Sequence, residues 1–163
     1  MKYEKDIILF INIKILEQIK DCVKKVYPNE ACGLIFGQIS EMRKPNRQNN
    51  FSYHYNAKKF ECIESSYKSS VAFLMDDYEK LVELSSNYFI RYNIQLLSIF
   101  HSHPGSAYPS SVDIPYMEGY YKGDIKKFKH LIWTIMDSKC EVLNGFIYIF
   151  EEIKQIKVEI RNK

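Results

Sequence analysis

The chain has 163 residues, of which 46% are apolar and 26% charged, and its formal charge is +3. This length suits one domain with a substantial core, and the composition excludes the disordered and fibrous classes. The charge is small and no cluster of basic residues is interleaved with aromatic ones, which argues against a nucleic-acid partner. We therefore expect one domain over residues 1–163.

The compartment can be predicted from the apolar segments and the cysteines. Residues 7–11 are apolar, but Asn12 and Lys14 follow them without a small-residue cleavage site, so we reject a signal peptide. No segment approaches the length of a membrane span. The four cysteines are scattered, and we interpret them as reduced thiols of a cytoplasmic protein without a disulfide framework. They are Cys22, Cys32, Cys62 and Cys140.

The first third of the chain predicts a strand, a helix and a second strand. Residues 7–11 are typical of a short buried strand, and Asn12 can cap the helix that follows. Apolar residues recur in this helix at steps of three and four. They are Leu16, Ile19, Val23 and Val26. Pro28 ends the helix, and the apolar run 29–37, bounded by glycine, predicts an interior strand.

The middle of the chain predicts a loop, a strand and a second helix. Residues 42–50 are polar and basic, as in an exposed loop, and residues 51–55 alternate as a strand does. We expect residues 58–70 to form an irregular connection, with a strand near residues 71–74. A second amphipathic helix begins at Asp76 or Asp77. Its apolar residues are Tyr78, Leu81, Leu84, Tyr88 and Phe89.

The last third predicts a strand, a short helix and two or three further strands. The first strand spans residues 94–100, and the helix, over residues 111–117, is closed by Gly119 and carries Asp113 in its first turn. The further strands lie at about 130–136, 145–150 and 153–160, and the last alternates as an edge strand does. This order predicts a mixed α/β fold, with a mixed β-sheet flanked by helices.

Two histidines after the strand 94–100 give the strongest functional signal. His101 and His103 are two residues apart, so in an extended strand both imidazoles point to one side and can share a metal. A loop rich in Gly, Ser and Pro lets the chain bring the carboxylate of Asp113 to the same point. Three protein ligands leave a fourth position for water, as in catalytic zinc sites. We predict that these three residues bind Zn²⁺.

A second carboxylate, Glu30, begins the interior strand 29–37, where a buried charge needs a partner. Glu30 stands in P-N-E-A-C-G, and the chain later contains H-S-H-P, then P-S, then S-x-x-D from Ser110 to Asp113. Together these segments resemble the JAMM motif of the JAB/MPN+ metalloprotease family, in its small stand-alone prokaryotic form. The resemblance extends over most of the chain, to about residue 137.

One departure concerns the motif serine. The family usually has seven residues between the second histidine and this serine, whereas Ser110 leaves only the six from Pro104 to Pro109. Ser111 would restore seven but would leave only Val112 before Asp113. We take Ser110, because S-x-x-D places the serine and the ligand on one short turn.

The resemblance implies a metal-dependent peptidase with an MPN/JAB fold. Zinc would lower the pKa of a bound water toward about 7, and Glu30 would be the general base that passes its proton to the leaving amine. The Ser110 hydroxyl would donate to the developing oxyanion, a contact worth roughly 3 kcal/mol in other enzymes. Chelators should therefore inhibit the enzyme, whereas alkylation should not.

The resemblance also implies a substrate class: an isopeptidase of this kind cleaves after the C-terminal tail of a ubiquitin-like or sulfur-carrier protein. Two alternatives stay open. The same chemistry could release cysteine from a sulfur-carrier C-terminus, or the domain could be a non-catalytic MPN scaffold. The DNA-repair-associated branch of the fold usually has Asn where this chain has Ser102, so we set it aside. Ser102 points away from the two histidines in a strand, and we expect it to bond to the backbone or to orient a ligand.

Overall fold

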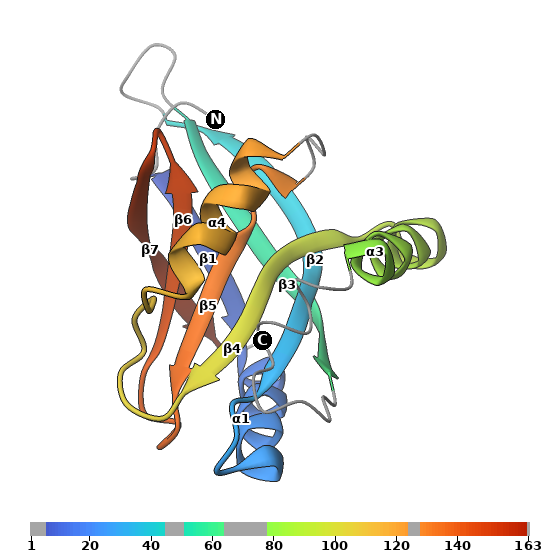
Figure 1. The fold of residues 1–163 in the computed structure, drawn as a ribbon. Coiled ribbons are helices and arrows are strands. Elements are labelled where there is room, and N and C mark those ends of the chain that lie inside the picture. Colours follow the sequence, from blue (N-terminus) through green and yellow to red (C-terminus); the bar gives the residue numbers. More distant parts are fainter. Residues whose placement is uncertain (1–5, 45–50, 64–77, 124–127, 163) are drawn as a thin grey trace.

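The computed structural model describes residues 6–44, 51–63, 78–123 and 128–162. Within these ranges the chain forms a mixed α/β fold of seven strands and three helices (Figure 1). The helices are α1 (Ile13–Val26), α3 (Tyr78–Tyr92) and α4 (Asp113–Lys122). The strands are β1 (Ile7–Asn12), β2 (Cys32–Arg43), β3 (Phe51–Ile63), β4 (Gln95–His103), β5 (Ile132–Asp137), β6 (Leu143–Ile149) and β7 (Glu152–Arg161). No helix in these ranges is long and apolar enough to cross a membrane.

The strands form one sheet that closes into a barrel in the order β1-β3-β2-β4-β5-β6-β7. β1 pairs in parallel with β3 and β7, β4 pairs in parallel with β5, and the remaining neighbours are antiparallel. Because β7 pairs with both β6 and β1, the prediction of an edge strand at 153–160 is wrong. The alternation in β7 instead separates a buried face from a solvent face: Ile156 is buried, and Lys157 beside it is exposed.

The first helix matches its prediction. The Asn12 side chain accepts a hydrogen bond from the backbone N–H of Ile15 at 2.9 Å, which caps α1. The helix ends at Val26, before Pro28. Of its predicted apolar face, Ile19 and Val23 are buried, whereas Leu16 and Val26 are only partly buried against the core. Ile15 and Cys22, which the prediction did not include, are also buried.

β2 and β3 are longer than predicted. β2 continues to Arg43, so the predicted loop is wrong at residues 42 and 43, and residues 45–50 lie outside the described ranges. β3 continues to Ile63, so the irregular connection is wrong at residues 58–63. The two strands pair along their whole lengths, from Cys32 with Ile63 to Arg43 with Phe51. Backbone pairing therefore keeps these segments extended, although their polar residues show no clear strand pattern.

The second helix buries two of its predicted apolar residues, and the third is displaced from its predicted bounds. α3 buries Leu81 and Tyr88 as expected, but Phe89 is 58% exposed. The predicted strand at residues 71–74 and the predicted helix start at residues 76–77 lie outside the described ranges. α4 runs to Lys122, so Gly119 lies within the helix, and the backbone N–H of Gly123 bonds to the Gly119 carbonyl at its end.

The apolar core forms two clusters on opposite faces of the sheet. Along β5 and β6, alternate residues belong to different clusters; Ile132 and Ile147 lie in the cluster that includes α1, whereas Trp133 and Phe146 lie in the other. This second cluster includes Leu81 of α3 and residues of α4, which crosses in front of β5 and β6 (Figure 1). It therefore fills the face that α3 and α4 cover.

The cysteines do not all follow the prediction. Cys22 of α1 and Cys62 of β3 form a disulfide, which contradicts the expectation of four reduced thiols. Cys32 and Cys140 are free. The error arose because the two partners are 40 residues apart in sequence and come together only when α1 packs on β3.

Candidate metal centre

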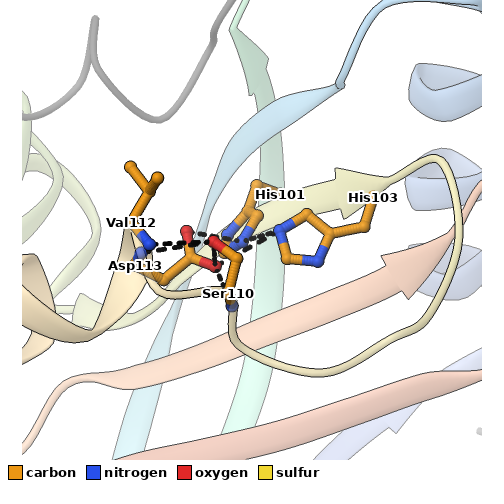
Figure 2. Close-up of polar contacts among 5 residues, drawn as sticks. All are labelled: His101, His103, Ser110, Val112 and Asp113. Atoms are coloured by element: carbon orange, nitrogen blue, oxygen red, sulfur yellow. Dashed lines mark hydrogen bonds and ion pairs between the residues drawn. The ribbon is translucent and has the colours of Figure 1, made fainter.

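The two histidines lie at the end of β4, with their imidazoles on the same side of the strand (Figure 2). Their Nε2 atoms are 3.0 Å apart. The His101 side chain is fully buried, whereas that of His103 is 11% exposed. His101 pairs with Ile135 across the parallel β4–β5 ladder, so it projects toward the face that α3 and α4 cover. The predicted pairing of the two imidazoles is therefore present.

Asp113, the first residue of α4, reaches both histidines. Its Oδ1 lies 3.3 Å from Nε2 of His101, and its Oδ2 lies 3.3 Å from Nε2 of His103. The carboxylate is almost completely buried. Figure 2 shows the three side chains converging on one point, although nine residues separate Asp113 from His103 in sequence. The structure thus brings together the three predicted ligands.

Ser110 joins this group through a reciprocal cap at the start of α4. Its backbone N–H and its hydroxyl both donate to Oδ2 of Asp113, at 2.6 and 2.7 Å. Its Oγ accepts in turn from the backbone N–H groups of Val112 and Asp113, each at 3.3 Å. These reciprocal bonds have the pattern of a capping box, set in the turn that leads into α4, whose first residue is Asp113. The S-x-x-D segment therefore sets both the helix start and the direction of the ligand.

The charges of the group are mutually dependent. Burial alone would raise the pKa of Asp113, but its contacts with His101 and His103 outweigh burial and hold this pKa well below its usual range. The hydrogen bond to Asp113 raises the pKa of His103, with smaller contributions from the charge of Glu30 and a hydrogen bond to the Ser106 backbone. Asp113 is therefore an anionic carboxylate facing two imidazoles.

Glu30 lies beside the histidines because β2 and the segment before it pair with β4. Cys32 pairs with His101. One step earlier, the backbone N–H of Ala31 donates to Oγ of Ser102 at 2.8 Å, and the Ser102 N–H donates to the Ala31 carbonyl at 3.0 Å. This confirms the predicted backbone contact of Ser102. Glu30 precedes Ala31 in the chain, and its negative charge raises the pKa of His103.

The donor set fits a small divalent cation. Two ligands bound about 2.0–2.1 Å from one tetrahedral ion lie roughly 3.3 Å apart. The histidine–histidine and histidine–carboxylate distances of 3.0 and 3.3 Å are close to this value. Among the described residues, the group contains His101, His103 and Asp113 without a fourth His, Cys, Asp or Glu. These three residues could hold Zn²⁺ and leave one position open.

Polar contacts that sequence reasoning missed hold the loop between His103 and Ser110. The Ser138 hydroxyl donates to the Pro104 carbonyl at 2.9 Å, and Nδ2 of Asn144 donates to the Ala107 carbonyl at 3.0 Å. Both donors come from the β5–β6 hairpin. No motif marks them; the only signal is a polar residue, Asn144, at the start of an otherwise apolar strand.

Two cavities of about 440 and 480 Å³ lie elsewhere. Both are lined by Phe89 of α3 and by Gln95, which begins β4 at the end opposite to the histidines. The candidate site is therefore separate from these cavities.

Comparison with known proteins agrees with this geometry. A family model described as prokaryotic homologs of the JAB domain matches residues 13–142, which include Glu30, both histidines, Ser110 and Asp113. The chain is similar in fold to the solution structure of protein DSY2949 from Desulfitobacterium hafniense. The TM-score is 0.66 and the identity 20%, over 96% of this chain and 94% of that one.

A JAB1/MPN domain protein from Archaeoglobus fulgidus, AF2198, also matches, with a TM-score of 0.49 and 12% identity over 90% of this chain and 95% of that one. A search of curated protein sequences finds no match. The family model alone covers most of the chain, including every candidate site residue. The chain therefore belongs to the family of prokaryotic homologs of the JAB domain.

Proposed function

We propose that this protein is a zinc-dependent peptidase that cleaves after the C-terminal tail of a ubiquitin-like or sulfur-carrier protein, at an amide or isopeptide bond. The observation that carries the proposal is the convergence of His101, His103 and Asp113 next to Glu30, in a chain of the JAB family. Two imidazoles, one carboxylate and an open position are the ligand set of catalytic zinc.

His101, His103 and Asp113 hold the ion. Zn²⁺ bound there supplies a Lewis acid for the scissile carbonyl and brings the pKa of a bound water to about 7. The capping bonds from Ser110 fix the direction of the Asp113 carboxylate. Full burial of His101 prevents its ring from turning away. The three ligands are thus oriented by the fold, as a catalytic metal site requires.

Glu30 acts as the general base: its carboxylate accepts the proton of the attacking water and later delivers it to the leaving amine. Glu30 is half-buried, and its charge raises the pKa of His103. The next residue, Ala31, is held by two hydrogen bonds to Ser102, which lies between the two histidines, and these contacts support the role. A base must lie within hydrogen-bond reach of the proton that it accepts.

Ser110 donates its hydroxyl hydrogen to the oxyanion that develops on the substrate carbonyl. In the structure the hydroxyl donates to Oδ2 of Asp113, and the two oxygen atoms are 2.7 Å apart. Donation to a substrate therefore requires the hydroxyl to rotate, while the backbone N–H of Ser110 keeps its bond to Asp113. The ligand thus stays oriented when the hydroxyl turns to the substrate.

Cleavage of defined fusions tests the proposal. The zinc-loaded protein is incubated with ubiquitin-like and sulfur-carrier proteins that carry C-terminal extensions, and mass spectrometry locates the cut. We expect cleavage directly after the tail. Glu30→Gln should abolish cleavage and keep zinc, because the amide cannot accept the proton, whereas His103→Ala should lose both. Glu41→Gln, on the exposed part of β2, the strand that follows Glu30 in the chain, is the matched control and should cut like the parent.

The alternative hypotheses predict different results in the same cleavage experiment. If the Glu30→Gln variant cleaves as fast as the parent, Glu30 is not the base. Release of free cysteine alone from a sulfur-carrier C-terminus would identify the sulfur-assimilation reaction. A zinc-loaded protein that binds such a carrier and cuts none of the fusions would be a non-catalytic scaffold.

A further inference from the structure

We infer that Asn144 is a positioning residue for the metal centre: its side-chain amide anchors the loop at Ala107 and so determines where His103 and Asp113 meet. This inference rests on the proposed function, because it concerns the geometry in which the three ligands bind a metal. Asn144 itself touches neither the ion nor the substrate in this proposal.

The third ligand depends on a loop. His101 and His103 lie on β4, whereas Asp113 follows the segment 104–112, which runs around the ends of β5 and β6 to α4 (Figure 1). Ligands on strands keep their positions better than ligands that follow loops. The path of this segment therefore decides whether Asp113 lies 3.3 Å from the histidines, as it does here.

Asn144 anchors the segment near its middle. Nδ2 of Asn144 donates to the Ala107 carbonyl at 3.0 Å, and Ala107 is only 3% exposed. A backbone carbonyl in such a position needs a partner, because leaving it unpaired is costly. The residue before it, Ser106, also influences His103, because its backbone helps to raise the pKa of that imidazole. A shift of the chain at Ala107 would therefore also change the surroundings of His103.

The orientation of the Asn144 amide is fixed from its other side. Oδ1 of Asn144 accepts a hydrogen bond from Nε2 of Gln155 on β7 at 3.3 Å. The reversed amide would oppose Oδ1 to the Ala107 carbonyl, and both of these oxygens can only accept hydrogen bonds. The donor must therefore face the loop, so the interaction specifically requires an amide.

The anchor belongs to the same sheet as the histidines. His101 pairs with Ile135 on β5, and Ile135 pairs with Asn144 on β6. The three residues form one row across the sheet, with their side chains on the same face. The distance between His101 and the anchor is thus set by backbone pairing. Asn144 thereby anchors the loop before the third ligand to the rigid sheet.

Metal affinity measures this role without reference to activity. The metal-free protein is titrated with Co²⁺, whose d–d absorption reports coordination geometry, and with Zn²⁺ in competition with a chromogenic chelator. We expect Asn144→Ala to weaken binding roughly tenfold or more, as loss of a group that orients a ligand does, and to change the Co²⁺ spectrum. Asn144→Asp keeps the shape but removes the donor, so it should weaken binding at least as much.

Asn56→Ala is the matched control. Nδ2 of Asn56 donates to the His54 carbonyl at 3.1 Å, a bond of the same type on β3. Its loss should leave the metal affinity and the Co²⁺ spectrum unchanged. Circular dichroism verifies that each variant is folded. If the Asn144→Ala variant does not fold, the isosteric Asn144→Asp variant provides the test.

Each outcome distinguishes the two proposals. Parental affinity and spectrum in a folded Asn144 variant would overturn the positioning role and leave the proposed function standing. Equal losses in the Asn144 and Asn56 variants would also overturn it, because the effect would not be specific to the loop. A parent protein that binds neither metal would contradict the proposed function, and the positioning role with it.

Discussion

The Ser110 hydroxyl has a structural role at the start of α4 and a proposed role in catalysis. The hydroxyl accepts the backbone N–H groups of Val112 and Asp113 and donates to the Asp113 carboxylate. Pro-Ser before a helix is an ordinary capping signal, and the structure contains that cap. The cap alone would explain the serine, so a catalytic role needs a measurement that separates rate from stability.

Ser110→Ala provides this separation. Loss of the cap should lower the free energy of unfolding by about 1 kcal/mol, and loss of the oxyanion donor should lower kcat by roughly 100-fold or more. Denaturant unfolding and steady-state kinetics measure the two effects. Ser111→Ala, at the exposed neighbouring position, should change neither. A normal kcat in the Ser110 variant together with a reduced one in the Ser111 variant would show that Ser111 is the motif serine.

The ligands themselves were predictable, whereas the residues that orient them were not. His101 and His103 share one side because of strand geometry alone. The approach of Asp113 was also expected, although its reciprocal bonds with Ser110 were not. Asn144 left no recognisable pattern, since its role arises from a contact with Ala107, 37 residues earlier in the chain.

Among the elements, helices and apolar strands followed their sequence patterns, and paired polar strands did not. The periodicity of α1 identified its buried face because a helix packs one side on the core. The outer part of β2 is exposed on both faces, so its side chains carry no alternation. It stays extended because β3 pairs with it, and such pairing partners are not visible in a local window of sequence.

The disulfide between α1 and β3 should contribute measurably to stability. Cys22 and Cys62 close a loop of 40 residues, for which the chain-entropy model gives about 4 kcal/mol of stabilisation. Cys62→Ser, or a thiol reductant, should lower the free energy of unfolding by up to this amount in denaturant titrations. Cys140→Ser, at a free and half-buried cysteine, is the control. Equal stability with and without reductant would show that the bond does not form in solution.

For the molecule as a whole, closure of the sheet was the feature that sequence could not reveal. β7 pairs with β1 from the opposite end of the chain, and its alternating pattern also suits an edge strand. The barrel matters for the site because it sets β2 beside β4 and β6 beside β5. Residues 30, 101, 113 and 144 then act on one small region, although they span most of the chain.

The proposed function requires His101, His103 and Asp113 to hold one divalent ion next to Glu30. Anomalous diffraction at the zinc absorption edge, from crystals of the zinc-loaded protein, locates this ion and the Glu30 carboxylate. We predict one zinc peak per chain, about 2.0–2.2 Å from Nε2 of both histidines and from a carboxylate oxygen of Asp113, with the Glu30 carboxylate within hydrogen-bond reach of a water on the ion. A zinc peak at another place would show that these three residues do not hold the ion. A Glu30 carboxylate too distant to contact that water would show that Glu30 is not the base.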